Sequence, residues 1–156
     1  MPVKTIGEVV FLLKRLCILF GICGAVYVLL ELIYRGRSHI SMFFAAGLSA
    51  VGIRLCCNCR RVKNRCLALK CLLGSALITV VEFCTGVVVN LWMKLQVWDY
   101  STMPLNLLGQ VCLPFSLVWF FLTLPILGLG ELLWGSYFSK EATKREIPAS
   151  PASSGE

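Results

Sequence analysis

The residues with the greatest chemical potential in this chain are two acids that stand inside long apolar segments. Glu82 lies near the middle of segment 72–93, and Glu31 lies near the end of segment 16–34. On insertion scales a charged acid at the bilayer centre costs about 2.5–3.5 kcal/mol, so such residues usually face the protein interior and mark a pathway or binding site. Small and polar residues recur around Glu82 at helical spacing, which places them on one face of a helix. The members of this stripe are Ser75, Thr79, Glu82, Gly86 and Asn90. Such a stripe is typical of a helix–helix contact rather than of a lipid-facing surface.

Further polar residues gather near the ends of the apolar segments that we predict to face outward. Together with Glu82 they form a candidate intramembrane and outer-leaflet site of Glu31, Arg35, Arg37, His39, Glu82, Asn90, Asp99, Asn106 and Gln110. We expect these side chains to converge in a polar pocket that opens outward and has Glu82 at its floor. The alternative is that they only hold the helices together. Glu31 would then pair with Arg35 one turn later, and Arg37 would pair with Asp99 or Glu82.

The chain lacks the residue patterns that carry soluble catalysis. It has no G-x-x-x-x-G-K-[ST] phosphate-binding loop, and His39 is its only histidine. Five of the nine cysteines lie in or beside the basic segment 54–70, but their spacing does not match the paired Cys or His ligands of structural zinc sites. We therefore expect no enzymatic activity, no cofactor and no metal site. Any ATP-driven function would need a separate ATPase.

The elements that must position these residues are membrane-spanning helices. Of the 156 residues, 58% are hydrophobic and 15% are charged, against about 45–50% and about 25% in a soluble domain. A helix needs about 20 mainly apolar residues to cross the hydrocarbon core. Four segments meet this requirement, and their approximate ranges are 16–34, 40–57, 72–93 and 105–127. They are too long and too uniformly apolar for barrel strands. We predict an all-α fold in which residues 16–134 form a compact bundle of four transmembrane helices.

The positions of the basic residues predict the orientation of this bundle. With four spans, twelve of the 15 Lys and Arg residues fall on the side of the N-terminal segment 1–15, the middle connection and the C-terminus. Basic residues collect on the cytoplasmic side of membrane proteins, so we expect a multi-pass protein of the cell membrane with both termini in the cytoplasm. The +7 net charge is then a topology signal that also attracts anionic membrane lipids. It does not indicate nucleic-acid binding, because no folded basic domain is present to carry it.

The last span and the C-terminal tail leave one question open. Pro114 and Pro125 lie in or near the fourth apolar segment, and a proline inside a helix removes a hydrogen bond and bends the helix. We expect a bend near Pro114. After Pro125 the chain either breaks into an interfacial helix or continues as one long tilted helix to Trp134. Segment 139–156 is rich in small and polar residues, and we expect it to be disordered.

Several of these motifs resemble those of a known family. They are the run Glu31-Leu-Ile-Tyr-Arg-Gly-Arg-Ser-His39, the run Glu82-Phe-Cys-Thr-Gly86 with Asn90, and the run Trp98-Asp-Tyr-Ser101 followed by Asn106 and Gly109-Gln110. This chain is similar over about residues 27–119 to the ABC-transporter type IV family of bacterial integral membrane proteins. The resemblance implies a bacterial membrane protein related to transporters, and it supplies no established binding residues.

Two functions remain open at this point. The first is a permease-like component of a transport system, which would require a separate ATPase and would work as a homo-oligomer, because four helices rarely enclose a path alone. The second is a non-transport membrane module, such as an assembly, sensing or lipid-binding subunit, whose polar cluster is structural.

Overall fold

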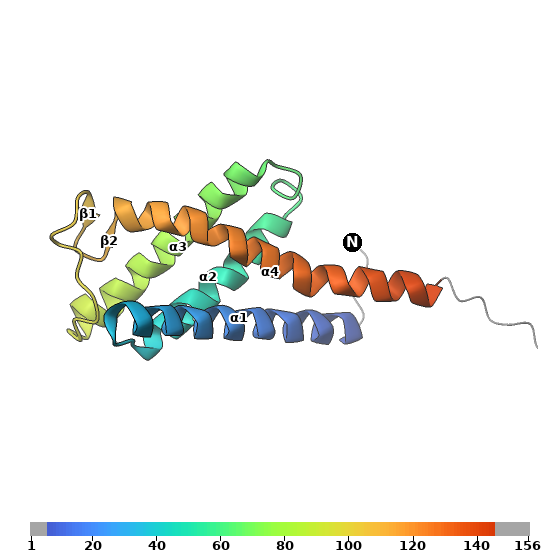
Figure 1. Cartoon of the computed structure of the whole chain (residues 1–156), viewed down its shortest axis with the longest axis horizontal. Helices are drawn as coiled ribbons and strands as arrows, with labels where there is room; N and C mark the ends of the chain where they lie inside the picture. Colours follow the sequence, from blue (N-terminus) through green and yellow to red (C-terminus); the bar gives the residue numbers. More distant parts are fainter. Residues whose placement is uncertain (1–5, 146–156) are drawn as a thin grey trace, which may run out of the picture.

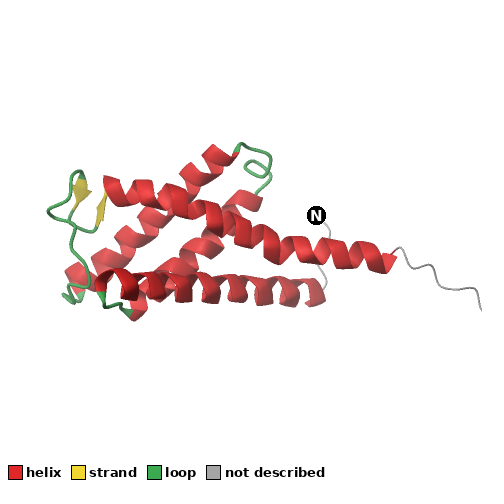
Figure 2. Ribbon diagram, in the orientation of Figure 1, coloured by secondary structure: helices red, strands yellow, loops and turns green. Residues whose placement is uncertain are grey.

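The structure is a bundle of long helices, and it confirms the all-α, four-span prediction. The computed structural model describes residues 6–145, with side chains through residue 134. Its elements in chain order are α1 (Ile6–Arg35), α2 (Ile40–Asn58), α3 (Leu67–Gly86), the π-helical turn η1 (Val87–Trp92), β1 (Asn106–Leu107), β2 (Val111–Cys112) and α4 (Leu113–Arg145). Four helices in the described residues are long and apolar enough to cross a membrane. Figure 2 shows that helices dominate and that the two strands sit in one loop.

Each long helix packs against the next one in the chain, and α4 also contacts α1. α1 lies along α2, α2 along α3 and α3 along α4, while α4 contacts α1 at few places. The start of α1, the end of α4 and the α2–α3 connection lie at one end of the bundle, which we call the terminal end (Figure 1). The α1–α2 connection and residues 93–112 lie at the other end, which we call the loop end.

Two helices are longer than the apolar segments that predicted them. α1 has 30 residues and begins ten residues before the expected start of the first span, and α4 has 33. At 1.5 Å per residue both exceed the hydrocarbon thickness of about 30 Å. α1 and α4 extend past the α2–α3 connection at the terminal end (Figure 1). The tail predicted to be disordered is helical up to Arg145, and residues 146–156, like residues 1–5, lie outside the described part of the chain.

The expected start of the fourth span near residue 105 is wrong. Residues 93–112 form a loop that contains a short antiparallel pair of strands, in which Asn106 lies opposite Cys112 and Leu107 opposite Val111. The Asn106 side chain accepts a hydrogen bond from the Gly109 backbone at 3.2 Å, and Gly109 has a φ of +67°. Asparagine and glycine favour such turns, so this segment folds as a hairpin although its leucines are apolar.

The prolines of α4 do not interrupt it. Pro114 is the second residue of the helix, a position where a missing backbone N–H has no intrahelical partner to lose. The bend expected near Pro114 is therefore wrong. Pro125 lies inside α4, and the helix runs through it, so the alternative of one long helix is correct.

The stripe, which runs along α3 into η1, is the face that packs against α4 and the loop. Ser75, Glu82, Gly86 and Asn90 are all buried. The Ser75 hydroxyl donates to the backbone oxygen of Ser116 on α4 at 2.6 Å. Polar and small residues therefore join these two helices, as their spacing predicted.

Gly74 allows the closest approach between α3 and α4. A Cβ at position 74 would overlap the fully buried Thr123 side chain and lie 2.7 Å from its Oγ1. We expect Gly74→Ala to lower the free energy of unfolding by about 1–3 kcal/mol, the usual cost of overpacking, as measured by thermal unfolding in detergent.

Gly21→Ala is the matched control, because a Cβ at Gly21 would meet nothing within 4 Å. Alanine is the better helix former by up to about 1 kcal/mol, so this variant should be as stable as the native chain or more stable. Equal effects of the two substitutions would contradict the α3–α4 packing described here.

Candidate functional site

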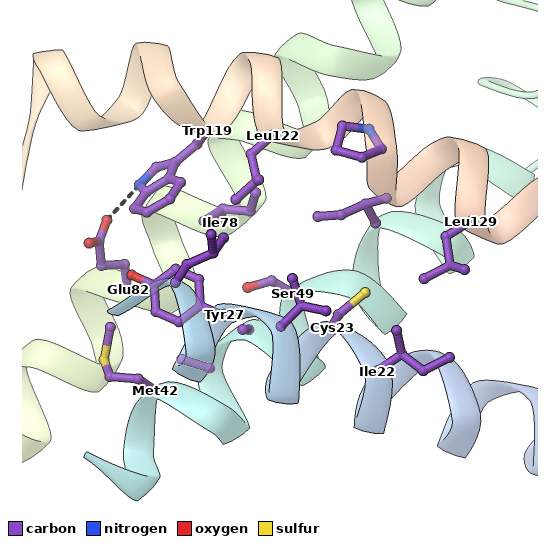
Figure 3. Close-up of a pocket in the computed structure, with 16 residues that line it drawn as sticks. Ile22, Cys23, Tyr27, Met42, Ser49, Ile78, Glu82, Trp119, Leu122 and Leu129 are labelled. Carbon is purple, nitrogen blue, oxygen red and sulfur yellow. Dashed lines mark hydrogen bonds between the residues drawn. The ribbon is translucent and has the colours of Figure 1, made fainter. Parts of the chain in front are cut away.

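Glu82 is held by two aromatic donors from different parts of the chain. Its side chain is buried, with 5% of its surface exposed. Trp119 Nε1 on α4 donates to Glu82 Oε2 at 2.8 Å (Figure 3), and the Tyr100 hydroxyl from the loop donates to Oε1 at 3.2 Å. Each carboxylate oxygen thus accepts one hydrogen bond from a neutral group. No cation among the described residues is found paired with Glu82, whereas Arg35 pairs with Glu31 and Arg54 pairs with Glu131.

Tyr100 closes the loop end above Glu82. Its ring stacks on Phe115 at a centroid distance of 4.7 Å and an interplanar angle of 22°. Burial, and then the neighbouring Glu82 carboxylate, raise the pKa of the Tyr100 phenol above its ordinary value. The phenol therefore keeps its proton at neutral pH and remains a donor to Glu82.

Asn90, Gln110 and Trp98 form a second, separate hydrogen-bonded cluster. Asn90 Nδ2 donates to Gln110 Oε1 at 2.8 Å and to the Trp98 backbone oxygen at 3.0 Å, and its Oδ1 accepts from the Val97 backbone at 2.7 Å. Trp98 Nε1 donates to the Gln110 backbone oxygen at 2.9 Å. The three side chains are buried. This cluster holds the loop against the end of α3 and η1. The side chains of Asn90 and Gln110, which we predicted to line a pocket, are thus hydrogen-bonded within the cluster.

Glu31 forms a third group at the end of α1. Arg35 and Ser38 both donate to its carboxylate at 2.6 Å, which confirms the helical Glu31–Arg35 pair. His39 Nδ1 accepts from the Ser41 backbone at 3.2 Å and so caps the start of α2. Arg37 is exposed and is not the partner of Glu82.

Asp99 and Asn106 shape the exposed tip of the loop. Asp99 accepts hydrogen bonds from the Ser101 backbone at 2.8 Å and from the Ser101 hydroxyl at 3.0 Å. Asn106 donates to backbone oxygens of the same loop. Both residues are exposed. The hydrogen bonds divide seven of the nine candidate residues among Glu82 with its aromatic donors, the Asn90–Gln110 cluster, the Glu31–Arg35 pair and the loop tip with Asp99 and Asn106. That all nine share one outward-opening pocket stays a prediction.

The hollow that touches Glu82 lies on its other side, toward the terminal end. It has a volume of about 290 Å³ and is lined by residues of all four long helices. We call it the α1–α4 cavity. Of the nine candidate residues only Glu82 lines it, and its other walls are mainly apolar, including Val26, Met42, Ile78 and Leu122. Figure 3 shows Ile78 and Leu122 between α4 and α1, with Glu82 and Trp119 at one end and Leu129 toward the other.

Two cavity residues were missed in the sequence. Tyr27 on α1 and Trp119 on α4 line the cavity, and their rings lie 6.0 Å apart. The position of Trp119 inside an apolar span could have indicated its role, because a buried indole N–H usually finds a hydrogen-bond acceptor. The acid on another span was the natural acceptor for Trp119.

The comparison with known proteins identifies the family. A family model described as "Putative ABC-transporter type IV" matches residues 3–145. The chain belongs to this family. No curated protein and no solved structure matches the chain. The match to the ABC-transporter type IV family includes all four long helices, the loop of residues 93–112 and the connection between α2 and α3. With four apolar helices, this member of the family is a multi-pass membrane protein.

The terminal end of this ABC-transporter type IV protein carries charged and aromatic contacts of its own. Arg54 Nη1 of α2 pairs with Glu131 of α4 at 2.8 Å, and the Arg54 guanidinium lies 4.3 Å from the centroid of the Trp134 ring. Arg15 of α1 lies 5.7 Å from the same ring. These contacts join three helices at the terminal end of the bundle. Among the described residues, no group of three His, Cys, Asp or Glu side chains could hold a metal ion.

Proposed function

We propose that this chain is a permease-like membrane subunit of a transport system in which a separate subunit hydrolyses ATP, and that it has no catalytic activity of its own. Membership in a family related to ABC transporters supports this proposal. The sequence contains no phosphate-binding loop, so ATP hydrolysis falls to another chain.

The observation that carries the proposal is the α1–α4 cavity with an acid at its end. The cavity is bounded by spanning helices and lies within the bundle. Ionisable residues inside spanning segments mark substrate or ion pathways. Glu82 lacks a cation partner among the described residues, unlike Glu31, which pairs with Arg35 at 2.6 Å. An acid that only stabilises helix packing, as Glu31 does through Arg35, would not require a cavity beside it.

We place the terminal end in the cytoplasm, with the ATPase docking there. Most basic residues of the chain belong to the segments at this end, and basic residues collect on the cytoplasmic side of membrane proteins. The parts of α1 and α4 that extend past the α2–α3 connection offer the ATPase a helical docking surface. The basic residues at this end attract anionic membrane lipids. We propose that at least two copies assemble with the ATPase, because four helices rarely enclose a path alone.

A second function is favoured by a different observation. The Asn90–Trp98–Gln110 cluster satisfies its own hydrogen bonds, which is what a structural polar cluster does. If Glu82 and the other intramembrane polar residues are also purely structural, the chain is a non-transport module, such as an assembly, sensing or lipid-binding subunit.

Affinity purification from the native membrane decides between these two functions. We expect the tagged chain to co-purify with a second polypeptide that photolabels with azido-ATP, and the purified complex to hydrolyse ATP. The mass of the complex would also give the number of copies. A tagged chain that purifies with no ATP-labelled subunit and no hydrolysis would reject the transport function and favour the non-transport module.

The orientation can be measured by labelling thiols in whole cells. Met103 is exposed in the loop, with 40% of its surface accessible, and Cys59 is exposed in the α2–α3 connection. In variants that keep a single thiol, a membrane-impermeant maleimide should label Met103→Cys in intact cells. It should label Cys59 only after the cells are permeabilised. The reverse pattern would place the terminal end outside the cell.

A further inference from the structure

We propose that the α1–α4 cavity binds a membrane-soluble amphiphilic amine, whose ammonium head pairs with Glu82 and whose aliphatic part fills the apolar body of the cavity. This proposal rests on the proposed transport function and names its substrate class.

The chemistry of the walls defines a ligand with one polar end. Among the residues that the structure describes, Glu82 is the only charged one that lines the cavity. The remaining lining is mainly apolar, with Tyr27, Ser49, Cys23 and the Trp119 indole as the neutral polar exceptions. An engineered apolar cavity of about 150 Å³ stays dry and binds benzene. A cavity of about 290 Å³ therefore accommodates a larger apolar group, near the lower end of the usual ligand-site range of about 300–1,000 Å³.

The polar end of the ligand should carry a positive charge. The two hydrogen bonds to Glu82 come from the neutral groups of Trp119 and Tyr100. Arg35, at the end of α1, is already bound to Glu31 at 2.6 Å. A carboxylate in apolar surroundings is costly unless a charge of opposite sign compensates it, and an ammonium group supplies both that charge and hydrogen-bond donors.

The ligand should enter sideways from the lipid. Three α1 residues that line the cavity are partly exposed, namely Ile22 at 39%, Val26 at 51% and Leu30 at 48%. α1 and α4 also contact each other at few places, so the cavity opens between these two helices. Tyr100 and its stack on Phe115 lie above Glu82 at the loop end, where they separate the acid from the aqueous side. A ligand that is already dissolved in the bilayer therefore has the shortest route to Glu82.

The test uses the chain alone in phosphatidylcholine nanodiscs and three probes of equal chain length: decylamine, decanol and decanoate. A ligand that binds only the folded state raises the melting temperature. We expect decylamine to raise the Tm, and decanol and decanoate to leave it nearly unchanged. In Glu82→Gln the affinity for decylamine should fall about tenfold or more, because a hydrogen bond to a charged group is lost.

A pair of alanine substitutions keeps the test valid even if Glu82→Gln fails to fold. Ala46 lines the cavity, whereas Ala76 is exposed on α3 and does not line it. Ala46→Leu should fill the cavity and remove the decylamine shift, and Ala76→Leu should retain it. Equal shifts in these two variants, or equal shifts by decanol and decylamine, would overturn the amine site.

The outcomes for the site and for the transport function can be separated. An ATPase that co-purifies with the chain, together with no decylamine shift, rejects only the substrate class. A decylamine shift that depends on Glu82, without any ATPase, keeps the site and assigns it to a non-transport module.

Discussion

Glu82→Gln should lower decylamine-stimulated ATP hydrolysis by the purified complex about tenfold or more, while leaving the thermal stability of the chain unchanged or higher. The amide can still accept a hydrogen bond from Trp119 or Tyr100, whose donors lie 2.8 and 3.2 Å from the carboxylate oxygens. It removes a charge that no cation among the described residues compensates, and a charged acid inside a membrane costs about 2.5–3.5 kcal/mol. The lost charge is the group that the proposed ligand needs. ATP hydrolysis and thermal unfolding would be measured on the same preparation.

Glu31→Gln is the matched control, since both acids are buried on spanning helices. Glu31 accepts hydrogen bonds from Arg35 and Ser38, both at 2.6 Å. Loss of its charge should lower the free energy of unfolding by about 1–3 kcal/mol and leave amine stimulation in place. If Glu82→Gln destabilises the chain as much as Glu31→Gln does, Glu82 is a structural residue and the functional assignment fails.

Asn90→Ala should lower the free energy of unfolding by about 2–4 kcal/mol, the largest stability effect that we expect from a single polar residue. Alanine would remove three hydrogen bonds and leave buried groups of Trp98 and Gln110 and a part-buried backbone N–H of Val97 without their partner. Each such bond within a membrane protein contributes up to about 1.7 kcal/mol, and buried groups left unpaired add about 1–3 kcal/mol each. Thermal or denaturant unfolding in detergent would measure the loss.

Asn106→Ala is the control of the same type. Asn106 also makes three hydrogen bonds, to the backbone of its own loop, but it is exposed. Water can replace these bonds, so the cost should stay below about 1 kcal/mol. If Asn106→Ala costs as much as Asn90→Ala, burial is not what gives the Asn90 cluster its strength.

The helices could be predicted from hydropathy because long apolar segments have few other stable structures in a bilayer. The exception was the start of α4. Leu105, Leu107 and Leu108 were counted with the fourth span because they are apolar. The side chain of Asn106 and the positive φ of Gly109 place them in a hairpin, and local turn chemistry outweighed hydropathy there.

The site could be predicted only in part. The α3 stripe followed from helical spacing, and the Glu31–Arg35 pair from a separation of four residues. The partners of Glu82 did not follow, because Trp119 and Tyr100 reach it through α4 and through the loop that folds back over α3. The cavity could not be predicted either. It depends on how far α1 and α4 stand apart, and the sequence pattern of either helix alone does not determine that distance.

The most direct measurement of the central claim is photolabelling of the chain in nanodiscs with a decylamine that carries a diazirine in its alkyl chain. We expect mass spectrometry to find label on cavity residues such as Val26, Ile78 and Leu122, and excess decylamine to compete it away. Label spread over exposed residues outside the cavity, such as Leu117 and Phe121, and unaffected by competitor would contradict the claim that the cavity around Glu82 is a binding site.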